Sequence, residues 1–526
     1  MPFDPNLPPN NVQVKAQGQP SWLGSTVDSG DKTGREPFLP HSSGWSDFSA
    51  KRTIESPPIP RMNAPLTDSP MQYLSTRGQT KPHTFSEAVE AGLAPDGGLF
   101  LPETLPSIAD KLPAWSKLTY PQLAAEFFTL FAPEISNAEW HQLTAEAYRR
   151  FDSPDVAPLK KITDQTYVLE LFHGPTLAFK DFALQLLGLL YKRQVEKTGK
   201  RLAVLGATSG DTGSAAIHGC LGRDGIMIFI LYPNGRVAPL QERQMACTGA
   251  DNVFAIPIPG TFDDAQRVVK DTFGDTAFAN SVNLSAVNSI NIARVLAQSV
   301  YYLWACLKLP ESARATAEYV VPTGNFGNVL AGWLAQQMGM PAGSFRVATN
   351  QNDILHRFFT SGDYHPSDVH PSHAPSMDIQ AASNFERFLY YILGQNTERV
   401  REVMTQIKSG APFKIDLPKT SLRSTRMDDD QIERVIAEMW QDWQYVLDPH
   451  TACAFTDMAQ DRVSVVLATA SPAKFPEVVQ RATGSEPTHP SLEVLKSKTL
   501  QTWPLNAEVA EVKSFIREHI RHGTNA

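Results

Sequence analysis

The stretch Leu169–Phe182, LELFHGPTLAFKDF, decides the fold expected for this chain. An apolar run at Tyr167–Phe172 predicts a buried strand, and the cluster His173–Thr176 predicts a turn. Lys180 follows between two phenylalanines, at the start of an apolar helical pattern. A lysine in an apolar pocket has a lowered pKa and can act as a Schiff-base amine. The alternative is an ordinary lysine whose stem packs on the rings while its ammonium reaches water.

The same order of strand, loop and helix recurs further along the chain. Apolar runs predict strands at 201–205, 226–232, 253–258, 318–321 and 463–468, with helical patterns between them. Apolar strands that alternate with helices favour a parallel, doubly wound sheet with helices on both faces. We therefore expect an α/β fold.

Composition divides the chain into three parts. Residues 1–70 hold twelve of the 40 prolines and show no helical or strand period, so we expect a disordered extension. Residues 71–160 predict a small, mainly helical N-terminal domain. Residues 161–526 predict the α/β region, with two subdomains and a helical insertion at about 350–445.

Net charge, the length of the apolar runs and the cysteine and histidine patterns exclude several classes of protein. A net charge of -8 argues against a general nucleic-acid binder, and no apolar run is long enough to span a membrane. The four cysteines form no CxxC pair, so neither a disulfide framework nor a zinc site is predicted, and we expect a cytoplasmic protein. His365, His370 and His373 lie in a proline-rich loop without metal spacing, so no metal is expected.

A glycine-rich loop after the strand at 318–321 has the composition of a phosphate site. Its candidate ligands are Gly324, Asn325, Phe326, Gly327 and Asn328. Glycines let the backbone approach a ligand, and the helix that follows offers free N–H groups and the positive end of its dipole. The loop has neither a Walker lysine nor a GxGxxG pattern, which argues against nucleoside triphosphates and dinucleotides. A tight turn without a ligand is the alternative.

A second loop, after the strand at 201–205, suits a carboxylate. It offers hydroxyl and backbone N–H groups from Thr208, Ser209, Gly210, Asp211 and Thr212. The alternative is that Asp211 or Thr212 caps the following helix. The serine is not in a GxSxG elbow, so hydrolase chemistry is not indicated.

An amine, a phosphate cradle and a carboxylate loop, all at strand ends, indicate pyridoxal 5'-phosphate and an amino-acid substrate. Lys180 would bond to the cofactor, and the glycine loop would hold its phosphate. Thr469, at the end of the strand at 463–468, is the best-placed partner for the ring nitrogen. Its alternative is an ordinary end-of-strand threonine.

These motifs resemble those of the threonine synthases, pyridoxal-phosphate enzymes of the tryptophan-synthase-β-like fold with two parallel-sheet domains. LELFHGPTLAFKDF is similar to the family's Schiff-base motif, with Lys180 in the lysine position. The other similar blocks are ATSGDTG (207–213), NSINIAR (288–294), PTGNFGN (322–328) and ATASPAKF (468–475). The blocks TRG (76–78) and GLAPDGGLFLP (92–102) resemble the family's N-terminal domain. Together with the segment near 350–445, they resemble the longer bacterial and fungal branch. Asp211 stands where many relatives of this fold have asparagine, which leaves its contact open.

The resemblance implies that O-phospho-L-homoserine and water give L-threonine and phosphate, with Lys180 as the base. The substrate phosphate needs an anion site of its own, for which we expect Ser289, Asn291, Arg294 and Lys474. For Asn291 and Arg294 the alternative is a helix cap or a salt bridge.

Two rival functions use the same motifs. A related phospholyase or dehydratase would release a 2-oxo acid, because it adds no water at Cβ. A catalytically silent protein would bind the cofactor only. A monomer and a homodimer are both compatible with the sequence.

Overall fold

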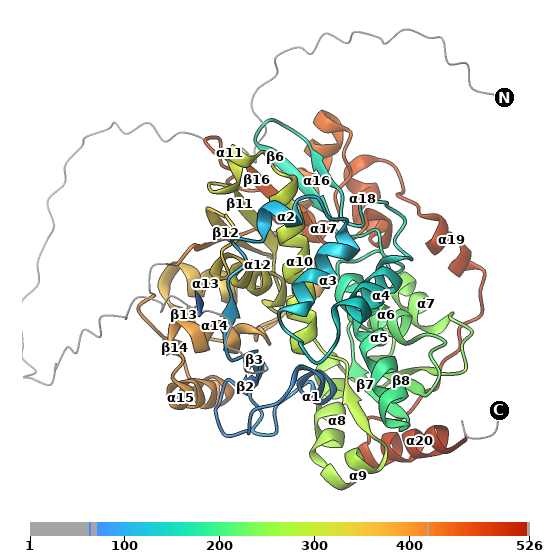
Figure 1. Cartoon of the computed structure of the whole chain (residues 1–526). Helices are drawn as coiled ribbons and strands as arrows, with labels where there is room; N and C mark the ends of the chain where they lie inside the picture. The colour runs from blue at the N-terminus through green and yellow to red at the C-terminus, as the bar shows by residue number, and fades with distance from the viewer. Residues whose placement is uncertain (1–62, 65–70, 418–419, 523–526) are drawn as a thin grey trace, which may run out of the picture.

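The computed structural model describes residues 63–64, 71–417 and 420–522 (Figure 1). The extension expected to be disordered, residues 1–70, lies outside these ranges apart from the short strand β1 (Asn63–Ala64). In the described part, β1 pairs in parallel with β4 (Leu105–Pro106).

Two sheets with parallel strands form the centre of the molecule. The larger has the strand order β15-β12-β11-β16-β6-β5, in which only β5 runs antiparallel to its neighbour. The smaller has the order β10-β7-β8-β9 and is parallel throughout. The predicted α/β fold with two parallel-sheet domains is therefore confirmed. The strands of the larger sheet are β5 (Leu159–Lys161), β6 (Thr166–Glu170), β11 (Glu318–Pro322), β12 (Ser344–Thr349), β15 (Leu422–Arg426) and β16 (Ser464–Ala468), and those of the smaller are β7 (Leu202–Ala207), β8 (Ile226–Pro233), β9 (Val253–Ile258) and β10 (Leu284–Ala286).

Both sheets are covered by helices, which explains the composition of their strands. Every residue of β9, β11 and β16 is buried, as expected where helices cover both faces of a parallel sheet. The helices that reach the site are α5 (Lys180–Thr198), α6 (Asp211–Cys220), α10 (Ile292–Lys308) and α12 (Gly327–Gln337). Helix α10 is buried from Ile292 to Leu307, which accounts for its apolar residues on all sides. Helices α5 and α6 touch at Gly188 and Gly219, where an added Cβ on either would strike the backbone of the other helix.

The N-terminal domain packs its helices on α5 and α10. It contains α1 (Phe85–Ala91), α2 (Leu112–Trp115), α3 (Tyr120–Thr129), α4 (Asn137–Tyr148) and the antiparallel pair β2 (Tyr73–Ser75) and β3 (Phe100–Pro102). The ring of Tyr120 meets those of Phe182 and Trp304 edge-on, at centroid distances of 5.5 and 5.6 Å. This aromatic contact joins the N-terminal domain to the first turn of α5 and to α10.

The segment between β12 and β16 contains helices and also a sheet strand. Its helices are α13 (Ile354–Ser361), η1 (Pro375–Met377), α14 (Phe385–Ile392), α15 (Thr397–Lys408), α16 (Asp429–Trp443) and α17 (Pro449–Ala452). Its strand β15 pairs with β12, and the small pair β13 (Asp363–Tyr364) and β14 (Phe413–Lys414) is antiparallel. The apolar patterns predicted neither β12 nor β15, because both carry arginines.

The last part of the chain returns to the smaller sheet. Helix α20 (Val509–His522) packs on α8 (Phe262–Gly274), and Val512 and Ile516 join the apolar cluster that contains Phe229 and Phe254 (Figure 1). None of the helices in the described ranges has the length and apolar composition needed to cross a bilayer.

Candidate active site

A cavity lies where strands of both sheets end and the following helices begin. In α/β sheets ligands bind at the carboxyl ends of the strands, which is the position of this cavity. It brings together many of the residues singled out from the sequence: Lys180, Asp211, Thr212, Ser289, Arg294, Gly324, Asn325, Phe326, Gly327, Asn328 and Thr469. The remaining candidates, Thr208, Ser209, Gly210, Asn291 and Lys474, do not line it.

Lys180 is the first residue of α5, and its amine faces a carboxylate. Its side chain is 11% exposed, and Nζ lies 3.0 Å from Oδ2 of Asp211 and 5.0 Å from the centroid of the Phe179 ring. Phe182 points the other way, into the aromatic core, so only one of the two neighbouring rings contacts the lysine. Burial lowers the pKa of Lys180, and Asp211 opposes this effect without cancelling it. The amine is thus buried, as the sequence suggested, but it lies beside an acid.

Asp211 is the first residue of α6 and binds two ammonium groups. Oδ1 lies 2.7 Å from Nζ of Lys474 and accepts a hydrogen bond of 2.7 Å from Nε2 of Gln241. Burial opposes ionisation of this carboxyl group, yet the Lys180 and Lys474 charges outweigh it and hold the pKa of Asp211 well below its usual range. Asp211 is therefore a carboxylate, and it is the one acidic side chain among the described residues that line the cavity.

The glycine loop has a strained residue, Phe326, and approaches a neighbouring segment closely at Gly324. Phe326 has a φ of 64°, in the left-handed region, and its buried ring packs edge-on against Phe385 at 5.6 Å. A left-handed non-glycine residue costs about 1–3 kcal/mol and recurs at ligand sites. At Gly324, an added Cβ would lie 2.7 Å from the carbonyl oxygen of Ser376. The loop therefore passes too close to the 375–377 segment for a side chain at Gly324.

Two buried donors at the cavity have no partner among the described residues. Tyr301 and Tyr302 both donate hydrogen bonds to Oδ1 of Asn328, at 2.5 and 2.8 Å, which leaves Nδ2 of Asn328 buried and unpartnered. Nε of Arg294 is also buried and unpartnered, while its Nη1 donates to the carbonyl of Asn288 at 2.7 Å. Burial lowers the pKa of Arg294 to about 10, and no carboxylate of the described chain pairs with it. Unpartnered donors beside a helix N-terminus suit an anion.

These features fit pyridoxal phosphate. The Gly324–Asn328 loop and the start of α12 offer donors for a phosphate, and Lys180 offers an amine for an aldehyde. Thr469 is fixed on both sides of its backbone, because its N–H donates to Oγ1 of Thr451 at 3.2 Å and its carbonyl accepts from the N–H of Phe179 at 2.9 Å. Its side chain is thereby presented to the cavity, on the side that also carries Lys180.

Three candidates from the sequence have protein partners of their own. Asn291 caps α10 by accepting from the N–H of Ala293 at 3.1 Å, and its Nδ2 donates to the carbonyl of Val89 at 2.8 Å. The Thr208 hydroxyl accepts from the N–H groups of Gly210 and Gly213, at 3.0 and 2.9 Å, and so shapes the carboxylate loop from behind. Lys474 is wholly buried against Asp211. Of the four residues expected to bind a substrate phosphate, the structure brings Ser289 and Arg294 to the cavity.

Local sequence patterns do not indicate the segment that lines the cavity next to the glycine loop. Ser376 and Met377 of η1 line the cavity together with His450 of α17. Nε2 of His450 accepts a hydrogen bond of 3.1 Å from the N–H of Ser376, and its Nδ1 lies 3.0 Å from Oδ1 of Asp448. No recognisable motif surrounds these residues, because the contact joins two segments 74 positions apart in the chain.

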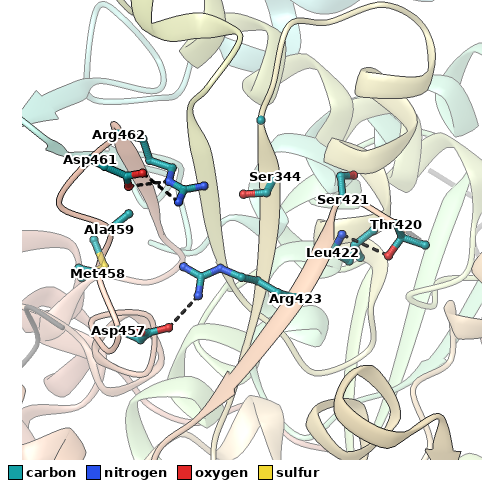
Figure 2. A pocket seen from close by; sticks show the side chains of 11 residues that line it. Ser344, Thr420, Ser421, Leu422, Arg423, Asp457, Met458, Ala459, Asp461 and Arg462 are labelled. Carbon is teal, nitrogen blue, oxygen red and sulfur yellow. Dashed lines mark hydrogen bonds and ion pairs between the residues drawn. The ribbon is translucent and has the colours of Figure 1, made fainter. Parts of the chain in front are cut away.

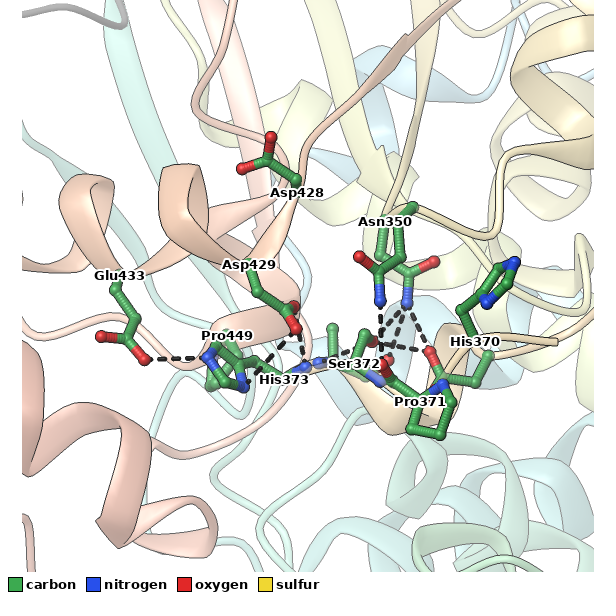
Figure 3. A network of polar contacts seen from close by, with 12 residues as sticks. Asn350, His370, Pro371, Ser372, His373, Asp428, Asp429, Glu433 and Pro449 are labelled. Carbon is green, nitrogen blue, oxygen red and sulfur yellow. Dashed lines mark hydrogen bonds and ion pairs between the residues drawn. The ribbon is translucent and has the colours of Figure 1, made fainter.

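Polar contacts anchor this segment just before it reaches the cavity (Figure 3). Nδ2 of Asn350 donates to Oγ of Ser372 at 2.7 Å, and the N–H of His373 donates to Oδ1 of Asp429 at 2.9 Å. The ring of His373 lies 2.8 Å from Oε1 of Glu433 on α16. Within the described ranges, no cluster of histidine, cysteine and acidic side chains is arranged to hold a metal.

A second hollow lies at the opposite edge of the larger sheet, where β12 and β15 begin (Figure 2). Its charged side chains already have protein partners. Arg423 binds Glu318 and Asp457, the latter at 2.7 Å, and Arg462 binds Asp461 at 3.0 Å. The cavity at the carboxyl ends, with its unpartnered donors, is therefore the candidate active site.

Comparisons with known proteins agree on one family. Three family models match successive parts of the chain: "Threonine synthase N terminus" at residues 72–148, "Pyridoxal-phosphate dependent enzyme" at 155–406 and "Threonine synthase, C-terminal" at 450–516. The threonine synthase of Pseudomonas aeruginosa is 44% identical over 467 residues, which cover 86% of this chain and 99% of that protein. The threonine synthase of Schizosaccharomyces pombe is 40% identical over 463 residues, which cover 79% and 90%. The crystal structure of pyridoxal-phosphate-bound threonine synthase from Brucella melitensis matches with a TM-score of 0.82 and 42% identity, over 86% of this chain and 100% of that one.

Proposed function

The chain belongs to the pyridoxal-phosphate-dependent threonine synthases, and we propose that it converts O-phospho-L-homoserine and water into L-threonine and phosphate at the Lys180 cavity. One observation carries the assignment to this cavity. A buried lysine amine, a carboxylate and unpartnered anion donors line the same space.

Residues from three strand ends would hold the cofactor. Its phosphate is assigned to Gly324, Asn325, Phe326, Gly327 and Asn328, where the buried Nδ2 of Asn328 and the start of α12 supply donors. Its ring nitrogen is assigned to the hydroxyl of Thr469, and its aldehyde to Lys180. Bound pyridoxal phosphate supplies an acceptor for the negative charge that develops at the substrate Cα.

Lys180 moves the protons. A base must be uncharged before it can accept a proton, and burial favours the uncharged amine of Lys180. Lys180 would take the proton from the substrate Cα and later the proton from Cβ. Phosphate departs from Cγ, which takes up a proton; water then adds its hydroxyl at Cβ, and a proton returns to Cα to give threonine.

Arg294 and Ser289 bind the substrate phosphate in this proposal. The Arg294 guanidinium is buried, lacks a carboxylate partner in the described chain and keeps Nε free for a ligand. Ser289 shares a hydrogen bond of 2.7 Å with Ser383, which places its hydroxyl at the same wall. A charge-assisted contact here would strengthen as phosphate leaves.

The substrate carboxylate is assigned to the loop Thr208–Thr212 at the start of α6. Thr212 reaches the cavity, and the Thr208 hydroxyl holds the loop from behind. The positive end of the α6 dipole favours an anion at this position. Ser209 and Gly210 belong to the same loop, in which the N–H of Gly210 donates to the Thr208 hydroxyl.

The products of O-phosphohomoserine turnover test the function. We expect phosphate and threonine in equal amounts from the cofactor-loaded protein. Phosphate with 2-oxobutyrate would identify the rival phospholyase or dehydratase, and cofactor absorbance without any turnover would identify a silent binder. The same assay with the Lys180→Ala variant should give neither product, because the base is lost.

The residues assigned to cofactor and substrate all belong to one chain, which is compatible with a monomer and with a homodimer. We place the protein in the cytoplasm, since its four cysteines are buried, unpaired thiols, as is usual in a reducing compartment.

A further inference from the structure

Asp211 lies between two lysines, and only one of them lines the cavity. Lys474, on the 3-10 helix η2 (Pro472–Lys474), has a fully buried side chain, with Nζ 2.7 Å from Oδ1 of Asp211 and 2.8 Å from the carbonyl oxygen of Thr176. Lys180 binds the other carboxylate oxygen, Oδ2, at 3.0 Å. One buried negative charge thus has two ammonium partners.

The two ammonium groups differ in freedom. The side chain of Lys474 is fully buried, and its Nζ also donates to a backbone carbonyl. Lys180 is partly exposed to the cavity, and within the described ranges its one ion-pair partner is Asp211. Lys180 can therefore move away from Asp211 by breaking a single ion pair, whereas Lys474 stays in place.

When Lys180 reacts, its amine loses the positive charge, and the Asp211 carboxylate loses one of its two counter-ions. The Asp211 side chain is only 3% exposed, and a buried carboxylate without a counter-ion is strongly unfavourable. If Lys180 were the sole partner, the carboxylate would hold it as a protonated ammonium. An ammonium is neither a nucleophile nor a base.

We propose that Lys474 is a positioning residue: its permanent ion pair keeps Asp211 charged and in place, so that Lys180 can lose its proton and leave. This role rests on the proposed function of Lys180. It replaces the expected contact of Lys474 with the substrate phosphate, since Lys474 points at Asp211 from outside the cavity.

Among the charged groups near this cluster, Lys474 remains the main counter-ion of the Asp211 carboxylate once Lys180 has lost its charge. Arg294 adds a second positive charge that also lowers the pKa of Lys180, and Asp181, on the same helix as Lys180, is occupied by the N–H and hydroxyl of Thr176. The charged or titratable groups that act on the cluster are Lys180 and Asp181 from α5, Asp211 from α6, Arg294 from α10, His450 from α17 and Lys474 from η2.

The test measures how readily Lys180 loses its proton. The full-length protein, freed of cofactor, is treated with a small acetylating reagent across pH 6 to 10, and the rate at Lys180 is followed by peptide mass spectrometry. With Lys474→Met, we expect the midpoint of the rate profile to move to higher pH and the rate at pH 8 to fall roughly tenfold, the equivalent of about one pKa unit. A rate within twofold of the wild type would overturn the proposal.

A double variant separates charge from structure. Asp211→Asn with Lys474→Met leaves neither a buried carboxylate nor its partner, so we expect Lys180 to react at least as fast as in the wild type. A slow double variant would overturn the proposal, and this arm remains decisive if the single variant does not fold. The matched control is Lys160→Met, which removes a lysine paired with Glu170 outside the cavity and should leave the rate unchanged. Because acetylation needs neither cofactor nor substrate, its outcome is independent of whether threonine is formed.

Discussion

The Tyr302 hydroxyl orients the Asn328 side chain by donating a hydrogen bond of 2.8 Å to its Oδ1. With its oxygen engaged, the amide of this cavity-lining residue leaves Nδ2 as a buried donor that has no partner among the described residues. A residue that sequence inspection placed in a phosphate loop thus has a specific reason to bind an anion. The tyrosine belongs to α10, so this helix prepares the loop from behind.

Asn328→Asp tests this donor with little change of shape. The aspartate keeps an acceptor for both tyrosines but replaces the two N–H groups with a negative charge. Since a hydrogen bond to a charged group contributes about 1.5–3 kcal/mol, we expect the dissociation constant of pyridoxal phosphate to rise roughly 100-fold. Absorbance titration measures it. Asn396→Asp is the control, because Asn396 caps an exposed helix start, where aspartate serves equally well.

Gly324→Ala tests how closely the loop approaches the 375–377 segment. The new Cβ would lie 2.7 Å from the carbonyl oxygen of Ser376, so the segment must shift, at a cost of about 1–3 kcal/mol. We expect a lower thermal midpoint and roughly tenfold weaker cofactor binding. Gly274→Ala is the matched control, since its Cβ meets no atom within 4 Å. Unchanged cofactor binding in the Gly324 variant would contradict the close approach.

Arg294→Gln separates the substrate phosphate from the cofactor phosphate. Loss of the buried guanidinium should lower kcat/KM for O-phosphohomoserine roughly 100-fold, while the cofactor absorbance stays at the wild-type level. Arg267→Gln, on the exposed face of α8, should change neither quantity. If the Arg294 variant instead failed to bind the cofactor, the guanidinium would belong to the cofactor phosphate.

His218 predicts a pH dependence of stability that is unconnected with catalysis. Burial lowers the pKa of His218 from 6.5 to about 4, and its Nδ1 is buried without a partner among the described residues. The unfolded chain therefore binds this proton more readily, so stability is complete above about pH 6.5 and is lost as pH falls toward 4. The contribution is at most about 3 kcal/mol.

Denaturant unfolding at pH 7 and pH 4.5 measures this effect. His218→Leu should lose less stability between the two pH values than the wild type does. His141→Gln, at a partly exposed ion pair with Glu126, is the control and should follow the wild type. Equal losses in the wild type and the His218 variant would show that another group carries the acid sensitivity.

Local sequence patterns predicted the strands that carry the site. They failed for strands whose burial depends on contacts with distant parts of the chain. The apolar run in β9 predicts that strand at its observed limits, 253–258. Strand β12 escaped prediction because a charged residue, Arg346, lies at its centre, buried beside Glu318. Burial of this arginine depends on an ion pair with a neighbouring strand, which no local pattern contains.

The residues of the site also differ in whether local sequence patterns predict them. Lys180 and the Gly324–Asn328 loop were predictable, because they follow directly from strand ends with distinctive composition. His450 and Ser376 were not, since they meet only through the folded chain. Lys474 and Asn291 were candidates on charge and polarity alone, and the structure gives each a buried protein partner.

The identity of the lysine that holds the cofactor is the most direct test of the central claim. Two lysines flank Asp211, and the geometry assigns the cofactor to the one that lines the cavity. The cofactor-loaded protein is reduced with borohydride, digested and examined by peptide mass spectrometry. We expect the cofactor mass on the peptide that contains Lys180 and on no other. Its appearance on Lys474, or on any other lysine, would contradict the assignment of Lys180 as the catalytic residue.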